Sequence, residues 1–536
     1  MRESGILLPV SALPSQHGIG KIGQRAFEFI DFLREAGCHY WQVLPLSPTG
    51  YGDSPYQSCS CFAGNPYLIS FDALTARGWL TPSDYVGLPW ETAPDKIDYA
   101  LLWQQVIPVL RIAHTRFLQH KPADYRKFCN EHKAWLPEYA LFMALKDVHA
   151  GRPWYEWEPE LAMRDPRVIA DARDHYAREI DFYTFVQYCF FSQWKSLKKY
   201  AHKNGIRIIG DIPIYAAYDS AEVWAQPELF RLDKDKKPVA VAGCPPDAFA
   251  LTGQLWGNPL WDWEKMAEDG YAWWLDRIAF VLDLYDLVRI DHFRGFEKYY
   301  AIPYGAETAE HGKWTKGPDY ALWKAAKKRF GEDMPVIAED LGNITPAVER
   351  LLRRTGFPGM KVMQFAFDSG ADNPYLPHNF TSPNCVCYTG THDNHTLRGW
   401  VKANSGAVNA YTMAYLNVKK EKQIPKAMIR AAWSSTARIA VAQMQDFLDA
   451  PPSARTNTPS TLGGNWAYRT ALSDYTPKLA AKIRRLNVTY GRLNTEPQPA
   501  EPEETKETKK APAKKAPQKR TAAKRAAQKK DAQNKP

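Results

Sequence analysis

The stretch that decides the fold runs from residue 6 to residue 46: ILLPV at 6–10, AFEFIDFLREA at 26–36 and YWQVLPL at 40–46. The first and third pieces are short apolar runs typical of buried strands. The middle piece places Phe27, Ile30 and Leu33 on one face of a helix, and Gly37 follows as its C-terminal cap. Strand, helix and strand in this order form a βαβ unit, which indicates a parallel sheet.

The same alternation continues along the chain. We expect further strands at 206–214, 287–293, 335–339, 361–367 and 385–388, and helices at 193–203, 273–284, 320–330 and 346–356. Repeated βα units without hairpins favour an α/β fold, a (β/α)₈ TIM barrel over residues 1–496, more than an open doubly wound sheet. Inserted, mostly helical subdomains are expected at about 48–190 and 216–265, the second being a long loop.

The formal net charge of +10 comes from the C-terminal tail. From Thr505 to Pro536 the chain has twelve Lys and Arg residues against two acidic residues, so residues 1–504 are balanced. This balance excludes a basic nucleic-acid footprint over the folded part. Residues 497–536 contain no aromatic, Leu, Ile, Val or Met side chain, so we expect a disordered basic tail there. It is either a solubilising appendage or a weak tether to nucleic acid or an anionic surface.

The rest of the composition is that of a large globular protein, with 45% apolar and 24% charged residues. The start, MRESGILLPVSALPS, has an acidic residue and an early proline where a signal peptide would be apolar. The uncharged run at 182–194 is too short and polar to span a bilayer. The C-x-C pairs at 59/61 and 385/387 favour buried structural cysteines over metal or redox sites. We therefore expect a cytoplasmic protein with no membrane contact.

Three of the expected strands end in carboxylates, and barrel chemistry takes place at the C-terminal ends of strands. Asp291 follows LVRI at 287–290, Glu339 follows PVIA at 335–338, and Asp393 follows CVCY at 385–388. One such acid is usually a helix cap or a solvated loop residue, but three are harder to dismiss. Converging acids suit glycoside chemistry, in which one attacks the anomeric carbon, a second transfers the proton and a third holds sugar hydroxyls.

Arg289 and His392 stand next to two of these acids. Arg289 precedes Asp291 by two residues, so both side chains point to one face of the strand, where the cation would keep Asp291 ionised. The alternative for Arg289 is a salt bridge that stiffens the barrel. His392 and His395 flank Asp393 and could bind a metal, but no third ligand is evident, and sugar-hydroxyl binding is favoured.

A dinucleotide-binding motif is the main false signal. GIGKIG at 18–23 matches G-x-G-x-x-G, yet it lies eight residues beyond the strand residue Val10. The fingerprint needs a tight strand–turn–helix and an acid after the next strand, whereas PLS at 45–47 supplies none. We expect these glycines to shape a loop that faces substrate.

Six separated segments together form a recognisable pattern: LPS at 13–15 with GIG at 18–20, YGDSPYQ at 51–57 with GNP at 64–66, PDAF at 246–249 with GQLWGNP at 253–259, RIDHFRG at 289–295, AEDLG at 338–342 and THDN at 391–394. GNW at 464–466 extends the pattern toward residue 470. The chain thereby resembles the 4-α-glucanotransferases called amylomaltases or disproportionating enzymes, glycoside hydrolase family 77.

The resemblance implies a (β/α)₈ barrel and a retaining transfer of α-1,4-glucan segments among maltooligosaccharides, amylose and glycogen, with no metal or organic cofactor. It implies Asp291 as nucleophile, Glu339 as general acid/base and Asp393 as transition-state stabiliser. The substrate-binding residues that it implies are Tyr56, Asp247, Gln254, Trp256, Arg289, His392 and Asn465. One departure is visible, since AYR at 467–469 follows GNW where the family often has a further Arg and Trp.

Two rival functions remain. An α-amylase-type hydrolase would use the same acids with water as the acceptor, and a non-catalytic glucan-binding protein would need none of them. The complete set of Asp291, Glu339 and Asp393 argues against the second rival.

Overall fold

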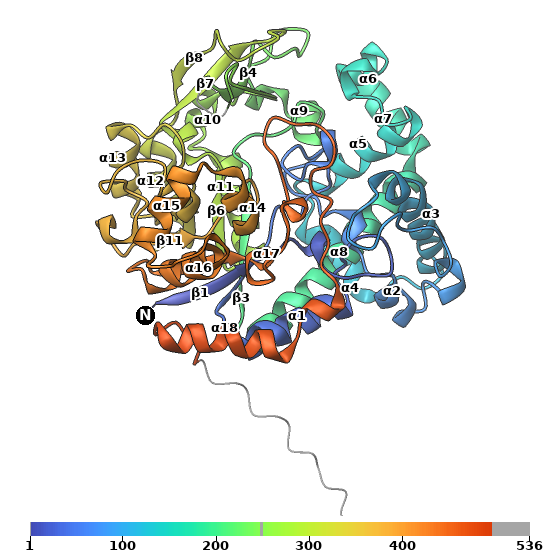
Figure 1. The fold of residues 1–536 in the computed structure, drawn as a ribbon. Coiled ribbons are helices and arrows are strands. Elements are labelled where there is room, and N and C mark those ends of the chain that lie inside the picture. Colours follow the sequence, from blue (N-terminus) through green and yellow to red (C-terminus); the bar gives the residue numbers. More distant parts are fainter. Residues whose placement is uncertain (1, 247–249, 496–536) are drawn as a thin grey trace, which may run out of the picture. The chain divides into compact units, whose positions relative to one another are not determined.

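The computed structural model describes residues 2–246 and 250–495, and its centre is an eight-stranded parallel sheet (Figure 1). The strand order is β10-β11-β12-β1-β2-β3-β6-β9. The strands are β1 (Glu3–Leu7), β2 (Tyr40–Gln42), β3 (Arg207–Ile212), β6 (Leu287–Ile290), β9 (Val336–Ala338), β10 (Gly359–Val362), β11 (Cys385–Tyr388) and β12 (Ile439–Gln443). The ends of this order meet, because the amide of Ala338, the last residue of β9, donates to Pro358 O just before β10 at 3.0 Å. The predicted (β/α)₈ barrel is confirmed.

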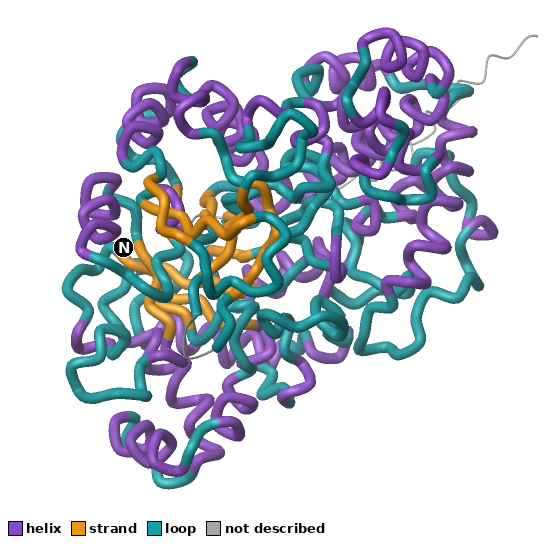
Figure 2. Tube along the Cα trace, turned by 90° about the horizontal axis from the view of Figure 1, so that it is seen from above, coloured by secondary structure: helices purple, strands orange, loops and turns teal. Residues whose placement is uncertain are grey.

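Helices surround these strands (Figure 2). Those that follow or flank the barrel strands are α1 (Gln24–Glu35), α8 (Ala177–Lys203), α11 (Ala272–Leu284), α12 (Tyr320–Phe330), α13 (Pro346–Thr355), α14 (Leu397–Ala403), α15 (Gly406–Tyr415), α16 (Ile424–Ser434), α17 (Met444–Phe447) and α18 (Pro477–Thr489). The expected caps are present: Thr345 accepts a hydrogen bond from the Val348 amide, and Gly37 and Gly356 have φ values of 68° and 73°.

The segment between β2 and β3 is helical. It contains α2 (Phe71–Ala76), α3 (Tyr99–Phe117), α4 (Ala123–Glu131), α5 (Leu136–Val148), α6 (Pro159–Ala162) and α7 (Pro166–His175) before α8. The helix expected at 193–203 is only the last part of α8, which begins at Ala177 and contacts α3, α4, α5 and α7. One helix therefore belongs both to this segment and to the barrel wall.

A second sheet corrects the expectation of a barrel without hairpins. The segment predicted as a long loop at 216–265 contains α9 (Ala221–Ala225), β4 (Ala240–Cys244), β5 (Gln254–Pro259) and α10 (Trp263–Glu268). β4 pairs antiparallel with β5 and with β7 (Lys298–Pro303), which pairs with β8 (Lys313–Lys316). Only two of the six residues of β5 and none of the four residues of β8 are buried, so these strands lack the continuous apolar runs that revealed the barrel strands.

The eighth barrel strand, β12, was also missed. Its sequence IAVAQ has two alanines and a glutamine in five residues, and alanine is depleted in strands. β12 pairs with both β1 and β11, so the last barrel strand of the chain lies beside the first one.

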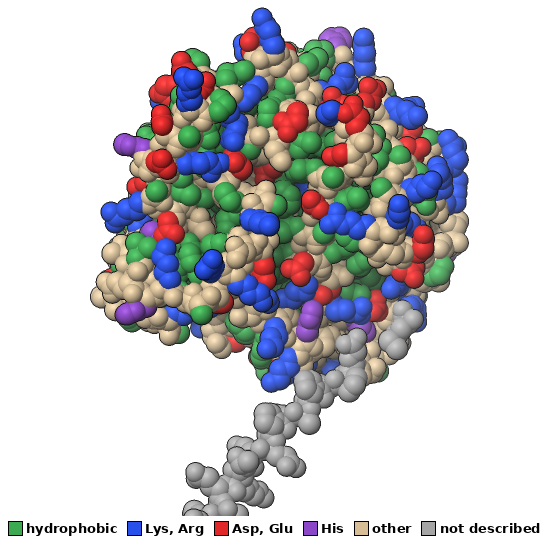
Figure 3. Space-filling view, turned by 180° about the vertical axis from the view of Figure 1, so that it is seen from behind, with side chains coloured by type: hydrophobic (Ala, Val, Ile, Leu, Met, Phe, Trp, Pro, Cys, Tyr) green, Lys and Arg blue, Asp and Glu red, His purple; other side chains and the backbone are tan. Residues whose placement is uncertain are grey.

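Charges of both signs are interspersed on the face shown in Figure 3. This distribution agrees with the neutral balance of residues 1–504. None of the helices in the described ranges has the length and apolar character needed to cross a membrane. The expected tail at 497–536 lies outside the described residues.

Candidate active site

Strand register brings the predicted acids together at one end of the barrel. In the β3–β6 pair Asp211 faces Arg289, and in the β6–β9 pair Ile290 faces Ala338. Asp291 and Glu339 are the next residues after Ile290 and Ala338, so they emerge side by side at the C-terminal ends of adjacent strands. This is the end of a barrel at which catalytic residues are found.

Arg289 joins two carboxylates. Its Nη2 donates to Asp291 Oδ1 at 2.8 Å, as the two-residue spacing predicts, and its Nη1 lies 2.9 and 2.7 Å from the two carboxylate oxygens of Asp211. Burial disfavours the charge of Arg289, but Asp211 and Asp291 outweigh this and raise its pKa. A permanent cation therefore lies against the Asp291 carboxylate.

Glu339 is buried beside this ion-pair network. Its Oε2 accepts from the His292 amide and its Oε1 from the Leu341 amide, both at 2.7 Å. Burial and the negative charge of Asp291 raise the pKa of Glu339 to about 8, although Arg289 and these amides oppose the rise. This shift favours the protonated carboxyl group, which is the form that a general acid needs.

Asp393 lies in the loop after β11 and is held by a second loop. Asn457 Nδ2 donates to Asp393 Oδ1 at 2.6 Å, and Arg455 Nη2 donates to the Asp393 carbonyl at 2.5 Å. The neighbouring His392 is buried, which lowers its pKa, and its Nε2 is 3.4 Å from Asp393 Oδ1. In the described part of the chain no group of three or more His, Cys, Asp or Glu side chains is placed to hold a metal ion.

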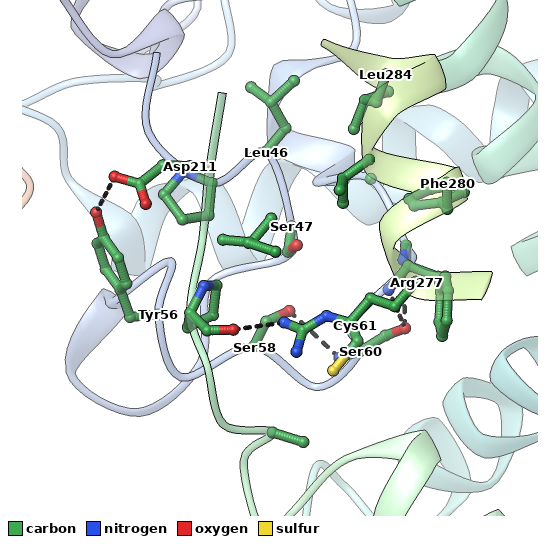
Figure 4. A pocket seen from close by; sticks show the side chains of 18 of the residues that line it. Leu46, Ser47, Tyr56, Ser58, Ser60, Cys61, Asp211, Arg277, Phe280 and Leu284 are labelled. Carbon is green, nitrogen blue, oxygen red and sulfur yellow. Dashed lines mark hydrogen bonds between the residues drawn. The ribbon is translucent and has the colours of Figure 1, made fainter. Parts of the chain in front are cut away.

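Tyr56 connects the Asp211 pair to the His392 loop. Its hydroxyl donates to Asp211 Oδ2 at 2.9 Å (Figure 4), and its ring stacks on His392 with centroids 5.1 Å apart. Trp466 tilts against both rings, with centroid distances of 5.7 Å to Tyr56 and 5.8 Å to His392. Asp211 also lines a cavity of about 30 Å³, enough for ordered water; Figure 4 shows the side chains around it.

Trp256 and Gln254 approach the site from β5. The Trp256 indole donates to Gln254 Oε1 at 3.1 Å, and its ring meets the His292 ring edge to face with centroids 4.9 Å apart. His292 follows Asp291 directly and has a left-handed backbone with φ 51°. Asp247 lies outside the described residues.

The side chain of Asn465 bonds to its own loop. Its Oδ1 accepts from the Thr458 amide at 2.9 Å and its Nδ2 donates to Thr461 O at 3.0 Å, so the side chain closes its own loop. Arg469, in the AYR segment that departs from the family pattern, anchors that loop. Arg469 forms an ion pair with Glu91 and donates to Ser15 O.

Sequence reasoning missed two functional candidates. Asp211 could have been found, because a carboxylate inside the apolar run RIIGDI is rarely buried unless it has a partner. Asn457 carried no such signal, since its contact with Asp393 joins loops 64 residues apart in the chain.

Comparison with known proteins identifies the family. A glycoside hydrolase family 77 profile, described as 4-alpha-glucanotransferase, matches residues 8–473. The chain belongs to this family. It is 47% identical over 485 residues to the 4-alpha-glucanotransferase of Clostridium butyricum, covering 90% of this chain and 99% of that protein. It is 45% identical over 502 residues to the Thermus thermophilus enzyme, covering 92% and 99%.

The structural likeness agrees with this assignment. An amylomaltase from Streptococcus agalactiae, solved in complex with acarbose, superposes with a TM-score of 0.90 at 40% identity and covers 92% of this chain and 100% of that one. The chain is accordingly a 4-α-glucanotransferase, an enzyme that transfers segments of an α-glucan.

Proposed function

We propose that Asp291 is the nucleophile and Glu339 the general acid/base of a retaining double displacement on α-1,4-glucans. The observation that carries this proposal is the placement of a buried Glu339, whose pKa is raised by burial and by the charge of Asp291, beside an Asp291 that is paired with Arg289. Two carboxyl groups with opposite protonation states are what acid-assisted attack on a glycosidic bond requires.

In the first step an Asp291 oxygen bonds to the anomeric carbon while the bond from that carbon to the 4-oxygen of the next glucose breaks. The departing oxygen takes the proton of Glu339. In the second step the Glu339 carboxylate accepts the proton of an acceptor's 4-hydroxyl, which attacks the same carbon and releases Asp291. Asp393 and His392 would bind hydroxyls of the sugar as its ring distorts.

Donors and acceptors in this proposal are maltooligosaccharides, amylose or glycogen, which are neutral polymers. Tyr56, Trp256 and Trp466 present aromatic rings around the acids, and such rings stack on sugar faces. We assign to these rings the role of holding an acceptor sugar in the position from which water would otherwise attack. This placement favours transfer over hydrolysis.

Incubation with maltotriose tests the proposal. Transfer produces a series of longer maltooligosaccharides together with glucose or maltose, which chromatography resolves. New reducing ends without longer products would instead show an α-amylase-type hydrolase, and binding without any product would show a glucan-binding protein.

Asp291→Asn tests the nucleophile and is expected to abolish the product series. Its matched control is Asp286→Asn at the opposite end of β6, where Asp286 accepts from the Ile208 amide at 2.8 Å and pairs with His202. That control should retain transfer, because residues at the N-terminal end of a barrel contribute to stability. Near wild-type activity of Asp291→Asn would refute the assignment.

A further inference from the structure

A cationic cleft lies beside the loops that follow β6 and β9. It has a volume of about 330 Å³, and its lining includes Arg294, Glu297, Lys298, Trp314, Thr345 and Arg350. A cleft of this size is in the range that holds a small organic ligand.

Arg294 is the unusual residue of this cleft. It is only 5% exposed, and its guanidinium lies 3.8 Å from the centre of the Trp314 ring. Its Nη1 donates to Asn343 O, but its Nε has no hydrogen-bond partner and no carboxylate forms an ion pair with it among the described residues. A buried guanidinium that uses so few of its five donors is unfavourable unless a ligand completes them.

The other charges around the cleft are mostly positive. Lys298 and Arg350 line it, whereas Glu297 is the one acidic residue in its described lining and lies 4.0 Å from the Lys298 ammonium. α13, a ten-residue helix, also begins at this cleft, so the positive end of its dipole adds to the field.

We propose that this cleft binds a phosphate monoester. A dianion matches the excess of three cations over one carboxylate, and guanidinium groups bind phosphate oxygens with paired N–H donors. Trp314, which is about one third exposed, offers an apolar surface for the sugar that carries the phosphate. The ester is either a free hexose phosphate or a phosphoryl group on an α-glucan chain; only the second source rests on the proposed function.

The cleft is joined to the catalytic loops. Arg294 follows Asp291 by three residues, and the carbonyl that it contacts, Asn343 O, follows Glu339 by four. A ligand held by Arg294 therefore lies next to both loops.

Isothermal titration of the full-length enzyme with glucose 6-phosphate, inorganic phosphate and glucose tests the site. We expect both phosphates to bind, glucose not to bind in this cleft, and added salt to weaken binding. Because Arg294 is buried and its loss could unfold the protein, the test variants are the exposed Lys298→Gln and Arg350→Gln, singly and combined. The double variant should bind at least about tenfold more weakly.

Arg353→Gln is the matched control. Arg353 lies in the same helix, pairs with Glu349 at 3.7 Å and does not line the cleft, so phosphate binding should be unchanged. Melting temperatures check that every variant is folded. Absence of phosphate binding by the wild type, or equal affinity of the double variant, would overturn the proposal.

Phosphorylated and enzymatically dephosphorylated maltodextrins distinguish the two sources. A lower KM for the phosphorylated chains, lost in the double variant, places the phosphoryl group on the glucan. Equal KM values together with binding of glucose 6-phosphate assign a free ester. Phosphate binding is measured by titration and does not depend on glucan transfer. The proposed mechanism and the proposed phosphate site can therefore be refuted independently.

Discussion

Asp211 and Arg289 face each other across β3 and β6, and both oxygens of the Asp211 carboxylate lie within 2.9 Å of Arg289 Nη1. Both side chains are almost fully buried. Removing one member of a buried ion pair commonly costs about 3–5 kcal/mol of folding stability. Asp211 also accepts a hydrogen bond from the Tyr56 hydroxyl. It therefore positions both the Arg289 guanidinium next to the proposed nucleophile and the Tyr56 ring that stacks on His392.

The first prediction concerns this positioning role. Asp211→Asn keeps the side-chain volume but removes the negative charge opposite Arg289, so the guanidinium should lose its alignment on Asp291. We expect kcat for maltotriose disproportionation to fall about 100-fold, since small displacements of catalytic groups have effects of this size. Tyr56→Phe is the control, because it removes only the hydroxyl and keeps the ring; its loss should be smaller. Wild-type kcat in Asp211→Asn would contradict the role.

Asp211 also shows which site residues can be predicted from the sequence and which cannot. Asp291 and Glu339 were predictable because each directly follows an apolar strand, and adjacent parallel strands end at the same rim. Asp211 sits inside its strand, so a rule about strand ends passes over it. The contact of Asn457 with Asp393 depends on how two distant loops pack, which no local pattern records.

The same distinction applies to the fold. The βαβ unit at residues 6–46 predicted the parallel barrel, because buried strands and an amphipathic helix each have a clear periodicity. β12 is alanine-rich, and most residues of β5 and all residues of β8 are exposed or half-buried, so the apolar signals of these strands are weak. Their pairing is determined by neighbouring strands more than by their own composition.

The second prediction is the pH dependence of Glu339. Its pKa is raised to about 8, and the first step needs the protonated acid. The rate kcat/KM should therefore fall as the pH rises through about 8, because the free enzyme loses that proton. Glu339→Gln should have very low activity, and its residual kcat/KM should not fall as the pH rises through this range. A flat wild-type profile across this region would contradict the acid assignment.

The third prediction concerns Trp256. Trp256→Ala removes the ring that packs against His292, so an acceptor sugar should be held less firmly. We expect KM for maltotriose as acceptor to rise about tenfold, equivalent to ~1.4 kcal/mol, and a larger share of glycosyl groups to go to water. The ratio of longer oligosaccharides to new reducing ends measures this share. Trp103→Ala, at an exposed position in α3, is the control and should leave the ratio unchanged.

The fourth prediction concerns Asp446, which fastens the loop that carries His392 and Asp393. Its Oδ2 accepts from Thr389 Oγ1 at 2.6 Å and its Oδ1 from the Leu397 amide at 2.8 Å, so one buried carboxyl holds both ends of the loop. Asp446→Ala should lower kcat by roughly tenfold or more through the misplaced loop. Thr389→Val removes one of the two bonds and should have a smaller effect.

Asp446 also gives a stability test with a defined sign. Burial raises its pKa from 3.8 to about 7, so between these values the folded protein binds more protons than the unfolded chain. Its contribution to stability is fully present below the lower value and is lost as the pH rises through the upper one. The melting temperature of Asp446→Asn, which resembles the protonated acid, should therefore change less over this window than that of the wild type. Equal slopes would contradict the account.

The fifth prediction separates the basic tail from catalysis. Every catalytic group proposed above lies before residue 497, and the glucan is neutral, so deleting residues 497–536 should leave kcat and KM for maltotriose unchanged. Residues 497–536 carry twelve basic and five acidic side chains, a net charge of +7, so the deletion should weaken retention on a cation-exchange column, and the difference should vanish at high salt. A full-length variant with Gln at the twelve basic positions distinguishes charge from length. If activity fell on deletion while the melting temperature stayed constant, the tail would have to take part in glucan binding.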